Sequence, residues 1–411
     1  MSGTALGALP LLRSLRVLEL GHYIAAPFAT RIMADLGADV IKVEPPGRGD
    51  PVRTWGMQVD GKSLWWSIHG RNKRSVTINM RHPEARDLVL ELAKQVDVVV
   101  ENYRPGQLEK WGLGPKEFEA AKPGLVLVRI SGYGQTGPEA SRSGFGVIGE
   151  AKGGLRHLCA YPEEVTDLPP VRTGIAIGDD ISGFYAAIGA LAAVIEQRES
   201  QHQELRVIDG ALGESVMTLL EGQLPEYGKF GKIRQPSGSW VSSAAPSNAY
   251  KSKDGAWVLV AGNSDPLFKA LAGIMGQPEL ADDPRFKDNQ VRCENVVELD
   301  RLIGAWVATL SAEEALEKLD EVNIPSSKIY TIADIAGDEQ YRERKAVTEV
   351  EDPHFGTVLH PGVVPVVAGL DRDAQIRWTG PEVGQHTSDV LSELLGLDDA
   401  AIAARRDSGL I

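Results

Sequence analysis

The sequence has few of the features that mark secreted, metal-binding or membrane-spanning proteins. It contains only two cysteines, Cys159 and Cys293, without C-x-x-C spacing, so neither a disulfide framework nor a zinc site is indicated. No uninterrupted apolar run approaches the ~20 residues that span a bilayer. The N-terminal stretch has no basic region ahead of its apolar residues, and Arg13 and Arg16 interrupt them. We therefore expect a cytoplasmic protein with no membrane span and no bound metal.

Basic residues are outnumbered by acidic ones. The chain has 43 lysines and arginines against 57 aspartates and glutamates, for a formal net charge of -14. Proteins that bind nucleic acid through its phosphate backbone need a basic field, so we expect no nucleic-acid partner. A local basic patch can still bind a small anionic ligand.

Several common catalytic motifs are absent. The first expected strand is followed by GHYIAAP, at residues 21–27, where a dinucleotide-binding turn would need G-x-G-x-x-G. The sequence also has no G-x-x-x-x-G-K-[ST], no H-E-x-x-H and no G-x-S-x-G. Dinucleotide binding, phosphoryl transfer, metalloprotease and esterase chemistries therefore lack their usual support.

The order of apolar segments predicts an α/β fold. Short β-branched runs alternate with helix-length segments through the first half of the chain, which is the rhythm of β-α-β units in a parallel sheet. Strands are expected at residues 16–20, 39–43, 75–79, 97–100 and 125–130, with a helix over 83–96. We expect a Rossmann-like parallel sheet without a dinucleotide fingerprint.

The remaining segments predict a second, smaller domain. A long, largely buried helix is expected over 180–198 and another over 211–224, followed by a stretch rich in Gly, Pro and Ser. We expect a large α/β domain over 1–226, a linker over 227–248 and a small α+β domain over 249–330. Residues 331–411 are expected to form a return linker and a C-terminal segment that packs on the large domain.

One acidic residue has two interpretations. Asp179 follows Gly178 and precedes an apolar helix, and the simpler interpretation is that its carboxylate caps that helix. Two adjacent acids, Asp179 and Asp180, exceed what one cap needs. A carboxylate at a helix N-terminus, framed by small residues that admit a ligand, can also act as a nucleophile or in proton transfer.

The segment LRVLELGHYIAAPFATRIMADLGADVIKVEPPGRGDPVR strongly resembles the N-terminal signature of the family III CoA-transferases, the CaiB/BaiF family. The resemblance continues through RNKRS at 71–75, VENYRPG at 100–106, GYGQTGP at 132–138 and the Gly178-Asp179 pair, then more loosely to about Leu394. It implies that Asp179 attacks an acyl-CoA thioester. The implied intermediates are an aspartyl anhydride, an aspartyl-CoA thioester and a second anhydride, which divide the exchange into steps of similar energy.

The resemblance also implies which residues contact coenzyme A, a substrate here and not a permanently bound cofactor. His22 and Ala25 are expected near the acyl end of the ligand. The other implied contacts lie along the pantetheine and phosphates or further out, and are Arg48, Asn72, Lys73, Asn102, Tyr103, Arg104, Lys110 and Arg142. Each has a rival interpretation as a solvated surface cation or an ordinary turn residue.

Two alternatives stay open. An α-methylacyl-CoA racemase of the same superfamily needs a histidine near residues 144–148, where this sequence reads GFGVI. A CoA-binding protein without catalysis would use Asp179 only as a cap. The resemblance further implies an interlocked homodimer with an active site made from both chains. Small dicarboxylates, with succinyl-CoA as donor, are the expected substrates, and Arg53, Arg71 and Arg74 are cationic candidates for a distal carboxylate.

Overall fold

The chain forms two compact units. The computed structural model describes residues 10–200 and 204–411, so the stretch considered above for a secretion signal lies partly outside the described residues. Among the described residues, the larger unit takes 10–156, 173–200, 204–230 and 339–411, and the smaller unit takes His157–Arg172 and Gly231–Asp338. Nothing in the sequence indicated that His157–Arg172 belongs with the smaller unit.

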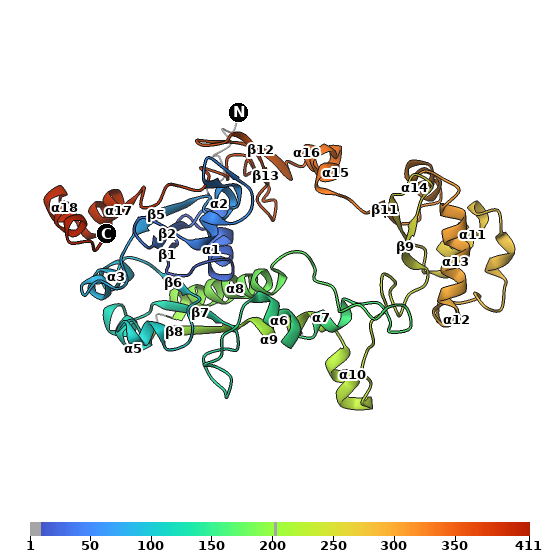
Figure 1. Ribbon diagram of the computed structural model, residues 1–411, viewed down its shortest axis with the longest axis horizontal. Coiled ribbons are helices and arrows are strands. Elements are labelled where there is room, and N and C mark those ends of the chain that lie inside the picture. The colour runs from blue at the N-terminus through green and yellow to red at the C-terminus, as the bar shows by residue number, and fades with distance from the viewer. Residues whose placement is uncertain (1–9, 201–203) are drawn as a thin grey trace. The chain divides into compact units, whose positions relative to one another are not determined.

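The larger unit is built on a six-stranded parallel sheet, labelled in Figure 1. Its strands in chain order are β1 (Arg16–Glu19), β2 (Asp39–Glu44), β5 (Lys73–Thr77), β6 (Val98–Glu101), β7 (Val126–Ser131) and β8 (Arg206–Ala211). They lie in the order β5-β2-β1-β6-β7-β8, with Val17 of β1 paired with Val40 and Val98. The five expected strands are confirmed to within two residues, and the mixed α/β class with them.

The strand β8 is missing from the prediction, which placed a helix from residue 211. The segment alternates exposed and half-buried side chains and includes Gly210, so it lacks the continuous apolar run of the central strands. An edge strand with one neighbour does not need such a run. Helices then follow at α9 (Leu212–Met217), η2 (Thr218–Leu220) and α10 (Gln223–Phe230).

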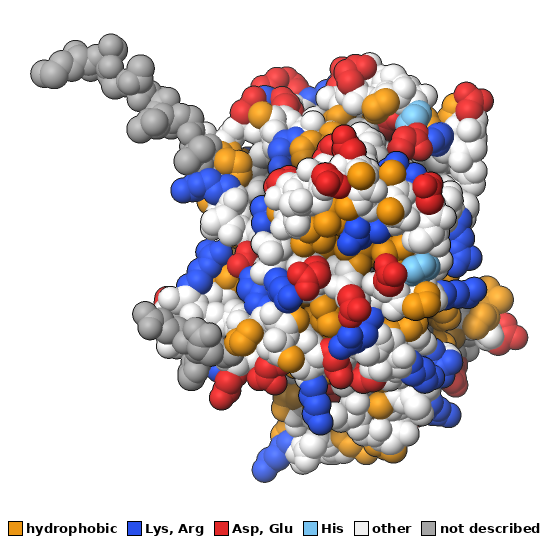
Figure 2. Space-filling view, turned by 90° about the vertical axis from the view of Figure 1, so that its left-hand side faces the viewer, with side chains coloured by type: hydrophobic (Ala, Val, Ile, Leu, Met, Phe, Trp, Pro, Cys, Tyr) orange, Lys and Arg blue, Asp and Glu red, His pale blue; other side chains and the backbone are white. Residues whose placement is uncertain are grey.

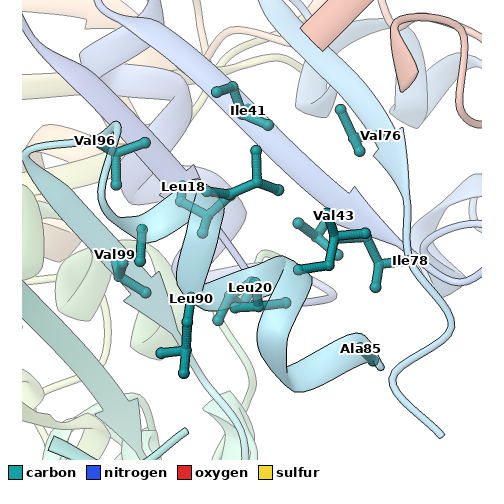
Figure 3. Close-up of a cluster of buried hydrophobic side chains, with 14 of the residues drawn as sticks. Leu18, Leu20, Ile41, Val43, Val76, Ile78, Ala85, Leu90, Val96 and Val99 are labelled. Atoms are coloured by element: carbon teal, nitrogen blue, oxygen red, sulfur yellow. The ribbon is translucent and has the colours of Figure 1, made fainter. Parts of the chain in front are cut away.

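Helices cover both faces of the sheet because side chains alternate across each strand. Leu18 and Ile41 face the layer formed by α3 (Ala85–Ala93), α5 (Pro115–Ala121), α17 (Thr387–Leu395) and α18 (Asp399–Asp407). Figure 3 shows the packing of this core around Leu18, Ile41 and Val76. Val17 and Val40 face the opposite layer, formed by α1 (Ala25–Asp35) and α8 (Ile177–Ser200).

Helix α8 differs from the expectation of a largely buried helix. Its alanines Ala186, Ala187, Ala190 and Ala193 pack on the sheet and on α1, but Phe184, Tyr185, Ile188 and Ile195 are exposed. The helix is long and apolar enough to cross a membrane by length and composition alone, a test that core helices of soluble proteins also pass. Its first turn carries both Asp179 and Asp180.

The larger unit also holds short elements around the sheet. They are η1 (Pro51–Thr54), β3 (Gln58–Val59), β4 (Lys62–Ser63), α2 (Leu64–His69), α4 (Gln107–Lys110), α6 (Gly146–Lys152), α16 (Glu339–Glu343), β12 (Val347–Asp352) and β13 (Gly356–Pro361). Helix α7 (Leu155–Leu158) lies at the boundary of the units. The C-terminal segment packs on the sheet edge, where Trp378 Nε1 donates to Lys73 O at 2.8 Å and Thr387 Oγ1 accepts from Thr77 N at 3.0 Å.

The smaller unit is α+β. An antiparallel sheet joins β9 (Ser247–Lys251), β10 (Trp257–Ala261) and β11 (Ser326–Lys328). Its helices are α11 (Asp265–Ile274), η3 (Pro278–Ala281), α12 (Asn289–Glu294), α13 (Val296–Val307), α14 (Ala312–Glu321) and α15 (Ile332–Gly337). Phe268, Leu271 and Ile303 are fully buried in its own core, separate from the two cores of the larger unit.

The surface carries no broad field of one charge on the face shown in Figure 2, where acidic and basic side chains are interspersed.

Candidate active site

The strand order places a crevice at the carboxyl ends of β1 and β6. The chain leaves β1 toward one side of the sheet and β6 toward the other, and open α/β sheets bind ligands at such a point. The loop after β1 carries His22 and Tyr23, and the loop after β6 carries Asn102 and Tyr103. The two signature segments that the sequence resemblance singled out therefore meet at the carboxyl ends of the two central strands.

Reciprocal hydrogen bonds hold the two loops together. His22 N donates to Asn102 Oδ1 and Asn102 Nδ2 donates to His22 O, both at 2.8 Å. Tyr103 Oη donates to Leu20 O at 2.7 Å and lies 3.0 Å from His22 Nε2. Because the hydroxyl proton is used on Leu20 O, His22 Nε2 must be the donor in the second contact. Asn102 and Tyr103 thus fix the position of the loop after β1.

Tyr23 has a backbone conformation that bulky residues rarely adopt. Its φ is 65°, in the left-handed region, and its N–H donates to Asp50 Oδ1 at 3.2 Å. The Tyr23 ring is exposed and makes an edge contact with Phe145, with ring centroids 6.5 Å apart. Such strain is held only where the surrounding structure enforces it, and it is common at functional sites.

A fully buried cluster of charges lies beneath the loop after β1. Lys42 Nζ pairs with Glu19 Oε1 at 2.6 Å and with Asp50 Oδ2 at 2.7 Å, and Lys73 Nζ pairs with Glu19 Oε2 at 2.8 Å. Burial alone would lower the pKa of Lys42, but Asp50 and Glu19 raise it above its usual value. Burial lowers the pKa of Lys73 to about 8, because Glu19 offsets only part of the desolvation.

Asp179 lies in the first turn of α8, where the helix dipole favours a negative charge. Its carboxylate is packed against the backbone of Gly146, since an ideal β-carbon on Gly146 would lie 2.0 Å from Asp179 Oδ2. A β-carbon on Gly178 would lie 2.6 Å from Gly146 O. Two glycines therefore allow α6 and the start of α8 to approach closely enough to position this carboxylate.

Asp180 lies in a different environment from its neighbour. Burial raises the pKa of Asp180 to about 6, and the charge of Arg31 on α1 opposes this rise. The Nε atom of Arg31 is buried without a hydrogen-bond partner among the described residues. Asp180 therefore faces α1, whereas Asp179 is a lining residue of a pocket.

That pocket has a volume of about 240 Å³. Asp179 and Phe145 line it together with residues from the loops after β1, β6 and β7. The full lining is Tyr23, Ala25, Asn102, Tyr103, Arg104, Pro105, Ile130, Ser131, Gly132, Arg142, Ser143, Gly144, Phe145, Asp179 and Leu212. We call it the nucleophile pocket. It places one carboxylate beside small residues and aromatic rings, an arrangement suited to attack on an acyl group.

A second pocket, of about 440 Å³, shares Tyr103 with the first. Its lining combines two exposed cations, Arg48 and Arg81, with apolar and aromatic surface. The full lining is His22, Val43, Glu44, Pro45, Pro46, Arg48, Ile78, Asn79, Met80, Arg81, Tyr103, Trp111 and Gly409. We call it the outer pocket. Its mixture of arginines and aromatic rings suits a phosphorylated, ring-containing ligand.

The two pockets gather most of the residues expected to contact coenzyme A. Ala25, Asn102, Arg104 and Arg142 line the nucleophile pocket, His22 and Arg48 line the outer pocket, and Tyr103 lines both. Arg104 Nη2 donates to Ser141 O at 2.7 Å, and Arg142 is paired with Glu139. Lys110 is exposed at the end of α4 and lines neither pocket.

Like Lys110, the buried residues Lys73 and Asn72 line neither pocket. Lys73 is fully buried, pairs with Glu19 and donates to Pro27 O at 2.7 Å. Asn72 is also buried, and its side-chain amide donates to Asp35 Oδ1 at 3.0 Å and to Gln375 O at 2.9 Å. Their signature segment therefore contributes structural contacts within the larger unit.

The three arginines considered for a distal carboxylate likewise form ion pairs within the larger unit. Arg53 Nη2 pairs with Glu44 at 2.7 Å, and Arg71 Nη2 pairs with Asp35 at 2.6 Å. Arg74 pairs with Asp39 and Glu393, each at 2.6 Å. Internal carboxylates therefore pair with all three side chains, and neither the nucleophile pocket nor the outer pocket is lined by any of them.

Sequence reasoning missed several lining residues. Tyr23 and Phe145 lie within the segments 21–27 and 144–148 considered above, but an aromatic side chain by itself does not indicate a ligand site. Asn79 and Arg81 follow β5 by a few residues, and the rule that sites form at the carboxyl ends of parallel strands could have identified them. Gly409 lies far away in the sequence, and no local signal could have linked it to the pocket.

Comparison with known proteins agrees with this geometry. The model of CoA-transferase family III matches residues 12–387. The succinyl-CoA–D-citramalate CoA-transferase of Chloroflexus aurantiacus is 45% identical, covering 95% of this chain and 96% of that protein. The beta subunit of the succinyl-CoA–L-malate CoA-transferase of the same organism is 37% identical, covering 100% of both.

A solved structure matches as well. The crystal structure of a CaiB/BaiF family protein from Brucella suis superimposes with a TM-score of 0.82 at 30% identity, covering 94% of this chain and 100% of that one. These matches to named transferases overturn the alternative of a CoA-binding protein without catalysis. The chain is an enzyme and belongs to CoA-transferase family III.

Proposed function

We propose that this enzyme transfers coenzyme A from succinyl-CoA to a small dicarboxylic acid by covalent catalysis at Asp179. The observation that carries the proposal is the position of the Asp179 carboxylate, which lines the nucleophile pocket at the N-terminus of a long helix. The substrate class is inferred from two relatives named for succinyl-CoA with D-citramalate or L-malate. Both acids are four-carbon-chain dicarboxylates with a hydroxyl group.

The proposed sequence begins with attack of an Asp179 oxygen on the thioester carbonyl, which forms an aspartyl anhydride as the CoA thiolate leaves. The thiolate then attacks the aspartyl carbonyl, releasing the donor acid and forming an aspartyl-CoA thioester. The acceptor carboxylate attacks this thioester to form a second anhydride, and the CoA thiolate leaves again. Attack of the thiolate on the acceptor carbonyl yields the new acyl-CoA and restores the Asp179 carboxylate. An aspartate is ionised at neutral pH, so no separate base is required.

The two pockets support a specific placement of the thioester. We infer that the reacting end lies in the nucleophile pocket beside Asp179, and that the nucleotide end lies in the outer pocket near Arg48 and Arg81. Tyr103, which both pockets share, would lie between the two ends along the pantetheine. Arginine side chains bind phosphate groups with charge-assisted hydrogen bonds, which favours this direction of binding over the reverse.

The racemase alternative has less support. Two-base proton transfer needs a second proton carrier across the α-carbon from the aspartate. Among the described residues, no histidine lines the nucleophile pocket, and the stretch near residues 144–148 that would have to supply one reads GFGVI.

We further propose that the enzyme is cytoplasmic and works as the interlocked homodimer that its family resemblance implies. The exposed apolar side chains of α8 support a partner on that helix: Ile188 is 61% exposed, and Phe184 and Ile195 are exposed with it. Contiguous apolar surface on a helix is typical of a subunit interface.

The test separates binding from exchange. Asp179→Asn keeps the size of the side chain but removes the nucleophile, so we expect coenzyme A binding by calorimetry to persist and exchange by mass spectrometry to disappear. Asp180→Asn, with the same chemical change one residue later, is the matched control and is expected to retain exchange. A panel of acyl-CoA donors with citramalate, malate, succinate and glutarate as acceptors identifies the acid pair. Near-normal exchange by the Asp179→Asn variant would refute the mechanism.

A further inference from the structure

The C-terminal turn, residues 408–411, has a fixed conformation. Gly409 N donates to Arg406 O and Leu410 N donates to Arg405 O, both at 3.0 Å, the paired bonds of a Schellman motif after α18. This motif needs a left-handed residue, and Gly409 has a φ of 77°. The glycine therefore reverses the chain at the end of the helix.

The turn is fastened to the carboxyl end of β5. Leu410 and Ile411 are buried in the core of the larger unit. Asn79 N donates to Leu410 O at 2.7 Å, and Asn79 Nδ2 donates to Gly409 O at 3.2 Å. A residue that follows β5 closely thus holds a segment that lies 330 positions further along the chain. The backbone at Gly409 consequently lies at the carboxyl end of β5, on the side of the sheet where the pockets are found.

Gly409 lines the outer pocket together with Arg48, Arg81 and Trp111. An ideal β-carbon at Gly409 would meet no heavy atom within 4 Å, so a side chain there would enter open space. A side chain introduced at this edge of the pocket therefore meets no steric clash at its β-carbon.

We propose that the turn of residues 408–411 forms part of the coenzyme A site and borders the phosphorylated nucleotide end of the ligand. The inference rests on the proposed function, because it takes the outer pocket as the place of the nucleotide. Asn79 acts here as a positioning residue, since it holds the turn through backbone oxygens. The contact is shared by the donor thioester, free coenzyme A and the product thioester, so it contributes to binding of all three and not to the chemical step.

The experiment changes the charge at residue 409. Gly409→Asp and Gly409→Lys place opposite charges at the same left-handed position, so backbone strain is common to both. At low ionic strength, Gly409→Asp is expected to weaken coenzyme A binding by about tenfold relative to Gly409→Lys, through repulsion of the phosphates, and added salt should reduce the difference. The KM for acyl-CoA should rise in the Asp variant while kcat and the KM for the acid stay unchanged.

A matched control lies at the end of α17. Gly396 also has a left-handed φ, of 65°, and a β-carbon there would also meet open space, but it does not line the outer pocket. Gly396→Asp and Gly396→Lys should bind coenzyme A equally. Equal binding by the two Gly409 variants, with both folded by circular dichroism, would overturn the proposal.

A second probe separates this inference from the proposed function. Adenosine 3′,5′-bisphosphate carries phosphates and adenine but no thiol, so its binding by calorimetry does not require transferase activity. If the charge at residue 409 alters its affinity, the turn borders the nucleotide site even when no acyl donor is turned over. If the enzyme exchanges coenzyme A normally and the charge at residue 409 alters the affinity of neither ligand, the turn has no part in binding.

Discussion

The Asp179 carboxylate occupies the space in which a side chain on Gly146 would begin. The distance from Asp179 Oδ2 to an ideal β-carbon on Gly146 is 2.0 Å, closer than real β-carbons ever approach an oxygen. The nucleophile proposed here is thus positioned by the absence of a side chain on the neighbouring helix α6. The glycine is as specific a requirement of the site as the aspartate.

Gly146→Ala should abolish most of the exchange activity. The added methyl group forces the Asp179 carboxylate to rotate away, and a displacement of about 1 Å at a reacting group can cost 100-fold in rate. Coenzyme A binding, measured by calorimetry, should remain. Gly273→Ala is a matched control in α11, where a β-carbon meets nothing within 4 Å. Full activity of Gly146→Ala would show that the carboxylate is not held in this position during turnover.

Asn102→Asp should loosen the loop that carries His22 and Tyr23. The substitution replaces the Nδ2 donor with an oxygen that faces His22 O, so one of two 2.8 Å bonds becomes repulsive. An unsatisfied, partly buried polar group costs about 1–3 kcal/mol. We expect a lower melting temperature and a higher KM for acyl-CoA. Unchanged values of both would contradict the role given to this reciprocal pair.

Ile188→Glu should weaken subunit association. The side chain is 61% exposed on α8, and a charge there would have to be desolvated in an interface. Sedimentation velocity at micromolar concentration should show a shift from dimer toward monomer. Val297→Glu, on the exposed surface of α13 in the smaller unit, makes the same kind of change and should leave the dimer intact. A wild-type enzyme that sediments as a monomer would rule out the proposed dimer.

The buried ring of His360 should lower the free energy of unfolding in acid. Its ring is buried, Nε2 lies 3.0 Å from Ser67 Oγ, and Nδ1 has no hydrogen-bond partner among the described residues. Burial, with a further contribution from Arg71, lowers its pKa from 6.5 to about 4. The folded state therefore binds fewer protons than the unfolded state between these values, so stability is fully present above pH 6.5 and decreases as the pH falls toward 4.

The test is denaturant unfolding of the His360→Gln variant across this pH range. Between pH 6.5 and pH 4, the unfolding free energy of the variant should decrease less than that of the wild type, by up to about 3 kcal/mol. His82→Gln makes the same change at a half-buried histidine just before α3 and is the matched control. An identical slope in His360→Gln and wild type would show that this ring does not govern acid stability.

The central strands were predictable because local patterns determine them, whereas the proposal of Asp179 as the nucleophile came from the family resemblance. Continuous apolar runs such as the three valines at residues 98–100 mark buried parallel strands, and the signature segments after β1 and β6 mark the crevice. The edge strand β8 and the turn at Gly409 depend on pairing with distant segments, which no local pattern records. The signature residues Asn72 and Lys73 make buried internal contacts, because a motif can be maintained by a buried ion pair as well as by a ligand. Sequence resemblance alone does not separate these two causes.

The central claim is that an Asp179 oxygen becomes acylated and then thioesterified during turnover. It is tested most directly by adding hydroxylamine to the working enzyme in the presence of succinyl-CoA and mapping the modified peptide by mass spectrometry. The account predicts a hydroxamate on Asp179 that appears only when donor thioester is present and is lost in Asp179→Asn. An unmodified Asp179 peptide from an active sample, or modification at another carboxylate, would contradict it.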